Sequence, residues 1–108
     1  MALALNWHKI AEHPNELNFG TNKIAIVAVE GKKFCVAHFN QQYFAFAYLC
    51  PHAGGVMAHG YVDAMGNVAC PTHRYKFNLR NGRNVTGEGY YLRHWKVEHR
   101  DDGVFVLL

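Results

Sequence analysis

Two short segments repeat one pattern of metal-binding residues. Cys50-Pro51-His52 places a thiol and an imidazole one residue apart, and Cys70-Pro71-Thr72-His73 places the same two groups two residues apart. Two thiolates and two imidazoles together make four metal ligands. A fold for this chain must therefore bring the two segments face to face, although residues 53–69 separate them.

The spacing bears on how many metals these residues hold. A single tetrahedral zinc ion could use the same four donors, but zinc sites usually pair two Cys about two to four residues apart and two His about three to five apart. Here each segment supplies one Cys and one His. The pattern favours two metal centres, as in a [2Fe–2S] cluster with Cys50 and Cys70 on one iron and His52 and His73 on the other.

The sequence on both sides of these segments predicts antiparallel strands. Alternation and β-branched residues indicate a hairpin of Lys23–Val29 and Phe34–Phe39, a buried strand Tyr43–Leu49 that is apolar on both faces, and a second hairpin of Arg93–Val97 with Val104–Leu107. No segment sustains a 3.6-residue period, so we expect at most a turn or two of helix around Pro14–Leu17. The fold class is all-β.

Between the strand regions lies a loop-rich segment. Residues 50–89 hold seven of the ten glycines, at positions 54, 55, 60, 66, 82, 87 and 89. A chain of 108 residues has room for one core. We therefore expect residues 1–108 to form one domain, an antiparallel β-sandwich or barrel with an inserted subdomain at about residues 49–83 that carries the metal ligands.

Composition and sequence pattern indicate in which cell compartment the protein works. The longest apolar run, Tyr43–Cys50, is far shorter than the ~20 residues of a membrane span, and the start of the chain lacks the pattern of a secretion signal. Three cysteines without an export signal suggest a reducing compartment and argue against a disulfide framework. We expect a cytoplasmic protein with no membrane contact, and the net charge of +3 does not by itself imply nucleic acid.

With its C-x-H and C-x-x-H segments, the sequence resembles the Rieske iron–sulfur proteins from about Trp7 to Val106. The strand before Cys50, the glycines after His52, and Phe77 and Gly82 after His73 extend the likeness. The resemblance implies one [2Fe–2S] cluster per chain, with Cys50, His52, Cys70 and His73 as its ligands.

The resemblance also implies a function. The chain is similar to the ferredoxins that carry single electrons from a flavin-dependent reductase to a terminal oxygenase. An alternative is the small subunit of a nitrite reductase-like complex, so whether the chain belongs to an enzyme stays open. A minor alternative is a zinc-stapled structural or nucleic-acid-binding module, but we expect no nucleic-acid partner.

Four departures from the family lie in or near the cluster loops. High-potential members carry an additional Cys in each loop and join the two in a disulfide, whereas Gly55 and Thr72 occupy the matching positions here. The usual Gly after the second His is Arg74, and Phe77 stands where those members have a Tyr hydroxyl. A loop at residues 86–89 replaces the proline-bearing loop that often covers the cluster.

The other cysteine, the tryptophans and the other histidines are predicted to have no role in metal binding. Cys35 is predicted to be a buried hydrophobe, and Trp7 and Trp95 are predicted to lie in the core. We expect solvated histidines at positions 8, 13, 38, 59, 94 and 99. Basic residues outnumber acidic ones between Arg74 and Arg100, so either a solvated face or a docking patch for an acidic redox partner is expected there, with Arg74 and Lys76 nearest the ligands.

Overall fold

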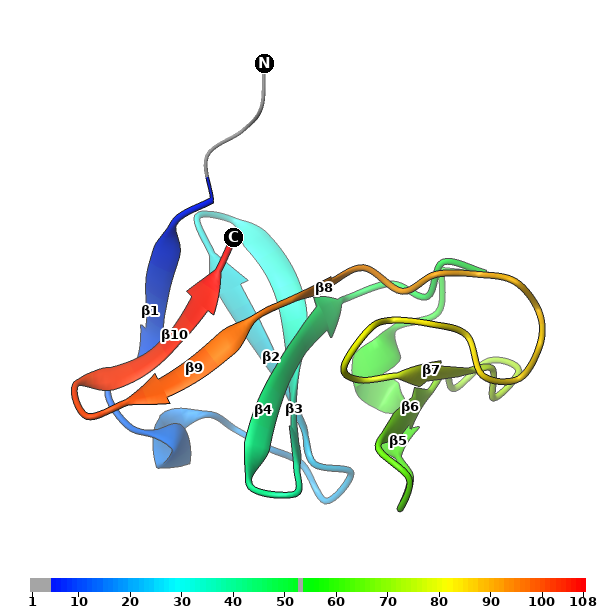
Figure 1. Ribbon diagram of the computed structural model, residues 1–108, viewed down its shortest axis with the longest axis horizontal. Coiled ribbons are helices and arrows are strands. Elements are labelled where there is room, and N and C mark those ends of the chain that lie inside the picture. The colour runs from blue at the N-terminus through cyan, green and yellow to red at the C-terminus, as the bar shows by residue number, and fades with distance from the viewer. Residues whose placement is uncertain (1–4, 53) are drawn as a thin grey trace.

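Three antiparallel sheets are built from residues 5–52 and 54–108, the part of the chain that the computed structural model describes (Figure 1). The first sheet contains β1 (Trp7–Ala11), β10 (Gly103–Leu107) and β9 (Val97–Arg100). The second sheet contains β2 (Ile24–Val29), β3 (Lys32–Phe39), β4 (Gln42–Ala47) and β8 (His94–Trp95). The third sheet contains β5 (Tyr61–Val62), β6 (Asn67–Ala69) and β7 (Lys76–Asn78). Single 3-10 turns occur at η1 (Pro14–Glu16) and η2 (Met57–His59), so the all-β prediction is confirmed. Over these residues no helix has the length and apolar character needed to cross a membrane.

The hairpins of the second sheet follow from their turn residues. Glu30 and Gly31 have φ angles of 51° and 81°, and Asn40 and Gln41 have φ angles of 52° and 62°. Two consecutive residues in this left-handed region form the two-residue turn whose twist matches that of antiparallel strands. The predicted hairpin of residues 23–39 therefore forms, with Val29 opposite Lys32.

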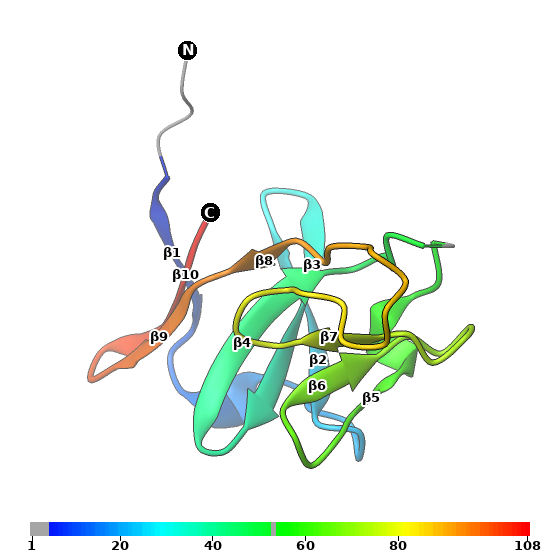
Figure 2. The ribbon, with the colours of Figure 1, turned by 45° about the vertical axis from the view of Figure 1, so that its right-hand side comes forward.

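The middle strand of the second sheet, β3, is covered on both faces by the other two sheets. On β3, Phe34 and Val36 pack with Val104 and Val106 of the first sheet, whereas Cys35 and Ala37 belong to the cluster of core residues on the opposite side. Figures 1 and 2 show β2–β4 between β1, β9 and β10 on one side and β5–β7 on the other. This explains why the central strands are apolar at nearly every position.

The second predicted hairpin forms between β9 and β10, but its first strand differs from the prediction. Instead of one strand at residues 93–97, β8 pairs with β4 through Ala45 and Trp95, and β9 then leaves that sheet to pair with β10. Strand β1 was not predicted. The prediction that both tryptophans lie in the core is wrong for Trp7, which is exposed beneath the guanidinium of Arg100. It holds in part for Trp95, which is half-buried and packs against the core.

A partly buried carboxylate joins the three strands of the third sheet. Asp63 follows β5 and accepts hydrogen bonds from the backbone N–H groups of Met65 and Asn67 and from the ammonium of Lys76 on β7, at 2.9, 3.0 and 3.0 Å. Burial by itself would raise the pKa of Asp63, but these bonds outweigh it and lower the pKa to about 2. The ionised carboxylate therefore stabilises the folded state.

We predict that Asp63→Asn lowers the free energy of unfolding by about 1–2 kcal/mol at neutral pH, after allowance for solvent screening. Because the folded-state pKa lies below the unfolded value of 3.8, this contribution is complete above about pH 4 and disappears as the pH falls towards 2. Urea unfolding of both proteins at pH 7 and at pH 4 and below measures the difference. Glu12→Gln, which removes an exposed pair with Lys9, is the control and should have little effect; equal losses in the two variants would contradict the assignment.

Candidate metal centre

The two cysteine segments fold into loops with the same backbone pattern. Cys50 donates its N–H to the carbonyl of Gly55 at 2.8 Å and accepts from the N–H of Gly54 at 3.0 Å. Cys70 likewise donates to the carbonyl of Tyr75 and accepts from the N–H of Arg74, both at 2.9 Å. The repeated sequence pattern thus produces a repeated loop, closed in each case by the cysteine's own peptide groups.

Each loop needs a residue in the left-handed region at the same place. Gly54 has a φ of 70° and Arg74 has a φ of 58°. Glycine reaches this conformation freely, whereas a residue with a side chain is disfavoured there by about 1 kcal/mol. Arg74 therefore replaces the glycine usual at its position and retains the loop shape at a cost.

The cysteines and the histidines lie in different environments. Cys50 and Cys70 are buried in the core that includes Met57, Phe77 and Leu79, whereas His52 is half-buried and His73 is exposed. The centre thus has an apolar thiol end and an imidazole end at the surface.

The two histidines face each other through the same ring nitrogen. Nδ1 of His52 and Nδ1 of His73 are 3.4 Å apart, and the ring centroids are 5.0 Å apart at an interplanar angle of 60°. Two nitrogens bound to one tetrahedral metal at about 2.0–2.1 Å would be separated by about 3.3–3.4 Å. The pair is therefore spaced as two ligands of one metal.

The donor set and its placement fit a [2Fe–2S] cluster. Two buried thiols could hold one iron and the paired imidazoles the other, which is the division that the sequence predicts. Within residues 5–52 and 54–108, no three His, Cys, Asp or Glu side chains are grouped around a single ion position.

The loops also approach each other at the positions where high-potential members of the resembled family have a disulfide. A β-carbon added to Gly55 would lie 3.6 Å from the β-carbon of Thr72 and 2.4 Å from its hydroxyl oxygen. Gly55 thus lets the loops approach closely.

Two tyrosines that were not among the predicted site residues lie against the histidine pair. The ring of His52 is 4.4 Å from that of Tyr75 and 5.1 Å from that of Tyr90, and Tyr75 is also 5.7 Å from His73. The position of Tyr75 two residues after His73 was a local signal. No local pattern indicates that Tyr90 returns to residue 52.

Charge differs between the two sides of the pair. On the His52 side, the hydroxyl of Thr86 donates a hydrogen bond to the carboxylate of Glu88. This bond, together with one from the amide of Asn84, lowers the pKa of Glu88 against the opposing effect of burial. On the His73 side, Arg74 is exposed. Lys76, expected to be a free positive charge, is instead paired with Asp63 at 3.0 Å.

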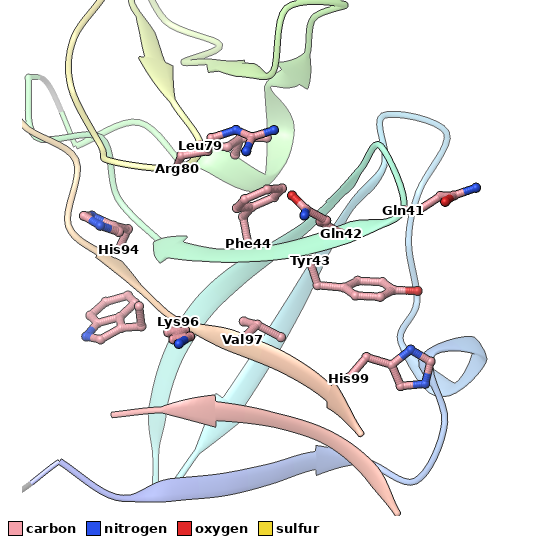
Figure 3. Close-up of a pocket in the computed structure, with 11 residues that line it drawn as sticks. Gln41, Gln42, Tyr43, Phe44, Leu79, Arg80, His94, Lys96, Val97 and His99 are labelled. Atoms are coloured by element: carbon pink, nitrogen blue, oxygen red, sulfur yellow. The ribbon is translucent and has the colours of Figure 1, made fainter. Parts of the chain in front are cut away.

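The other singled-out residues lie outside this centre. Cys35 is fully buried, and burial raises its pKa to about 12, which confirms a hydrophobic role. His94 contacts Tyr91. A groove of about 580 Å³ lies where Phe44 of β4 faces Arg80 after β7 (Figure 3), and the described residues that line it include none of the four candidate ligands.

Comparison with known proteins identifies the family. The Rieske [2Fe–2S] domain family matches residues 6–90. No curated protein matches the chain.

Solved structures share the fold across nearly the whole chain. The ferredoxin of carbazole 1,9a-dioxygenase from Nocardioides aromaticivorans IC177 is 21% identical with a TM-score of 0.77, covering 96% of this chain and 97% of that one. A protein named as the small subunit of an NADPH nitrite reductase is 24% identical with a TM-score of 0.79, covering 96% and 100%. A chain from a complex of reduced oxygenase and oxidized ferredoxin in carbazole 1,9a-dioxygenase is 23% identical with a TM-score of 0.78, covering 94% and 92%.

At these identities the solved structures establish a common fold. The family match also establishes to which family the chain belongs. The all-β Rieske fold inferred from the two Cys/His segments is confirmed. The chain belongs to the Rieske [2Fe–2S] domain family, and it is an electron-transfer protein whose cofactor is a [2Fe–2S] cluster.

Proposed function

We propose that this chain is a soluble, cytoplasmic one-electron carrier between a flavin-dependent reductase and a terminal oxygenase. Its cluster is held by Cys50 and Cys70 on one iron and by His52 and His73 on the other. The observation that supports this best is the facing pair of imidazoles at the protein surface, with Nδ1 atoms 3.4 Å apart. A carrier needs a redox group close to the surface, where a partner protein can approach it.

We propose that residues 1–108 form a single domain and that residues 49–83 form its cluster-binding subdomain. The second sheet shares apolar side chains with both of its neighbours, which supports one cooperative unit. The third sheet and both cysteine loops lie within residues 49–83.

We propose that electrons are exchanged on the His73 side. His73 is exposed, whereas His52 is half-buried beside Tyr75 and Tyr90. Arg74, adjacent to His73, keeps its charge at the surface despite a left-handed backbone that glycine would adopt more easily. Such retained strain is typical of residues with a functional role, so Arg74 is the charge that steers an acidic partner.

The alternative is a small [2Fe–2S] subunit of a nitrite reductase-like complex. The likeness to a nitrite reductase small subunit, which covers 100% of that chain, favours it. Gel filtration of the protein from its native cells separates the two proposals, because a carrier elutes at its own 12.3 kDa and a subunit elutes with a larger partner protein. Reduction of an oxygenase by the isolated small chain would further support the carrier.

We predict that the purified chain holds two irons and two acid-labile sulfides, and that Cys50→Ser and His52→Ala each lose most of this iron. Iron and sulfide analysis together with the visible absorption spectrum measure the outcome. His59→Ala, at an exposed histidine at the end of η2, is the matched control and should bind a full cluster. A full, unaltered cluster in Cys50→Ser would contradict the ligand assignment.

We predict that Arg74→Glu slows oxidation of the reduced protein by ferricyanide about threefold or more at low ionic strength, and accelerates its reaction with hexaammineruthenium(III). Stopped-flow kinetics at low and high salt measure both rates, and salt should remove the difference. Arg80→Glu makes the same charge change in the groove of Figure 3 and should have a smaller effect. Equal effects of the two variants would mean that exchange does not occur beside Arg74.

We predict that the double variant Gly55→Cys and Thr72→Cys forms a disulfide between the cluster loops. The 3.6 Å between the two β-carbon positions falls within the range of about 3.5–4.5 Å that disulfides require. Mass spectrometry before and after reduction detects the bond. Each single variant is a control that cannot form it, and two free thiols in the oxidised double variant would contradict the loop contact.

A further inference from the structure

We propose that Tyr75 and Tyr90 form an aromatic clamp that holds the ring of His52 in its metal-binding orientation, and that Asn84 is the residue that positions Tyr90. The inference rests on the ligand assignment proposed above. It concerns the affinity and geometry of the metal centre and does not depend on the identity of any redox partner.

The clamp consists of three rings in mutual contact. Tyr75 and Tyr90 are stacked at an interplanar angle of 21° with centroids 6.2 Å apart, and the ring of His52 contacts both at tilts of 41° and 57°. A histidine side chain can otherwise rotate about two bonds, and only some orientations direct Nδ1 at its partner. Contact with two rings restricts that rotation, and in this orientation Nδ1 faces Nδ1 of His73.

Tyr75 and Tyr90 come from different segments, which Asn84 joins. Tyr75 directly precedes β7, and Tyr90 ends the loop that follows Asn84. The side-chain amide of Asn84 donates to the carbonyl of Lys76 on β7 at 3.1 Å, and its oxygen accepts from the N–H of Gly89 at 2.9 Å. Asn84 therefore fixes the residue before Tyr90 to the strand that follows Tyr75.

Further bonds support the same loop. The amide of Asn84 also donates to the carboxylate of Glu88 at 3.0 Å, and the N–H of Val85 donates to the carbonyl of Lys76 at 2.9 Å. Positive φ angles of 90° at Gly87 and 83° at Gly89 turn the chain back towards His52. The loop that replaces the family's proline-bearing segment is thus a hydrogen-bonded support for one ring.

The clamp acts unequally on the two histidines. His52 contacts both tyrosines, whereas the ring of His73 lies 5.7 Å from Tyr75 and is exposed. One imidazole is thereby fixed by protein contacts, and the other is left open on the side where exchange is proposed. Tyr75, Tyr90 and Asn84 are positioning residues in this arrangement.

The test compares Tyr90→Ala, Tyr90→Phe and the control Tyr91→Ala in the cluster-loaded protein. Tyr90 is 39% exposed and Tyr91 is 54% exposed, so the variants remove similar surface rings, but Tyr91 contacts His94 rather than His52. We measure the rate of cluster bleaching in excess iron chelator and the electron paramagnetic resonance spectrum of the reduced protein. The spectrum reports the orientation of the imidazoles on iron, which a loss of general stability would not shift.

We expect Tyr90→Ala to bleach about two- to tenfold faster than wild type and to show shifted or broadened resonances, since one aromatic contact has been removed. Tyr90→Phe keeps the ring and should behave as wild type, as should Tyr91→Ala. Asn84→Ala should resemble Tyr90→Ala, which provides a second variant that leaves all three rings in the sequence.

Wild-type bleaching and spectra in both Tyr90→Ala and Asn84→Ala would overturn the clamp, and so would equal changes in Tyr90→Ala and Tyr91→Ala. Neither result would affect the ligand assignment, which fails separately if the wild-type chain lacks two irons and two sulfides.

Discussion

The structure depends on the approach of two loops that each close on a cysteine. Because the N–H and C=O groups of Cys50 and Cys70 are hydrogen-bonded within their own loops, both residues lie in an apolar core with their peptide groups satisfied. Charge is consistent with this burial: two ferric ions, two sulfides and two thiolates sum to zero when the remaining ligands are neutral imidazoles. Four thiolates would leave a buried charge of −2, which is costly to desolvate. Histidine thus permits a deeply seated thiol end and a surface imidazole end.

Burial of apolar side chains also connects the cluster loops to the rest of the chain. Strand β3 sends Phe34 and Val36 to one side and Cys35 and Ala37 to the other, so the second sheet needs a cover on both faces. The first sheet supplies one cover. The third sheet and the cysteine loops supply the other, through Met57, Val68 and Phe77. Loss of order in the loops would therefore expose one face of the central sheet, which supports our proposal that the chain forms one domain.

Structural features that depend on residues close together in the chain were predictable from the sequence. The turns at Glu30-Gly31 and Asn40-Gln41 and the two Cys/His segments depend on short-range patterns. So does the strand predicted at residues 43–49, which forms as β4 over residues 42–47, although only Ala45 and Phe46 in it are buried and Leu49 is exposed. Features set by distant residues were not predicted. Trp95 pairs with Ala45, Lys76 is neutralised by Asp63, and Tyr90 returns to His52, and in each case the partner lies far away in the sequence. Local periodicity carries no information about such contacts, which depend on how the sheets pack.

The two loops share a backbone shape but have different surfaces. The two histidines therefore differ in exposure and in the charge beside them. In the first loop, glycine occupies the left-handed position, and His52 is covered by tyrosines brought from residues 75 and 90. In the second, Arg74 occupies the equivalent position beside an exposed His73. A symmetric pair of loops would offer a partner two equal approaches to the imidazoles. If electrons are exchanged on the His73 side as we propose, the tyrosines beside the half-buried His52 leave the His73 edge the more open of the two, and Arg74 places a positive charge there for an acidic partner.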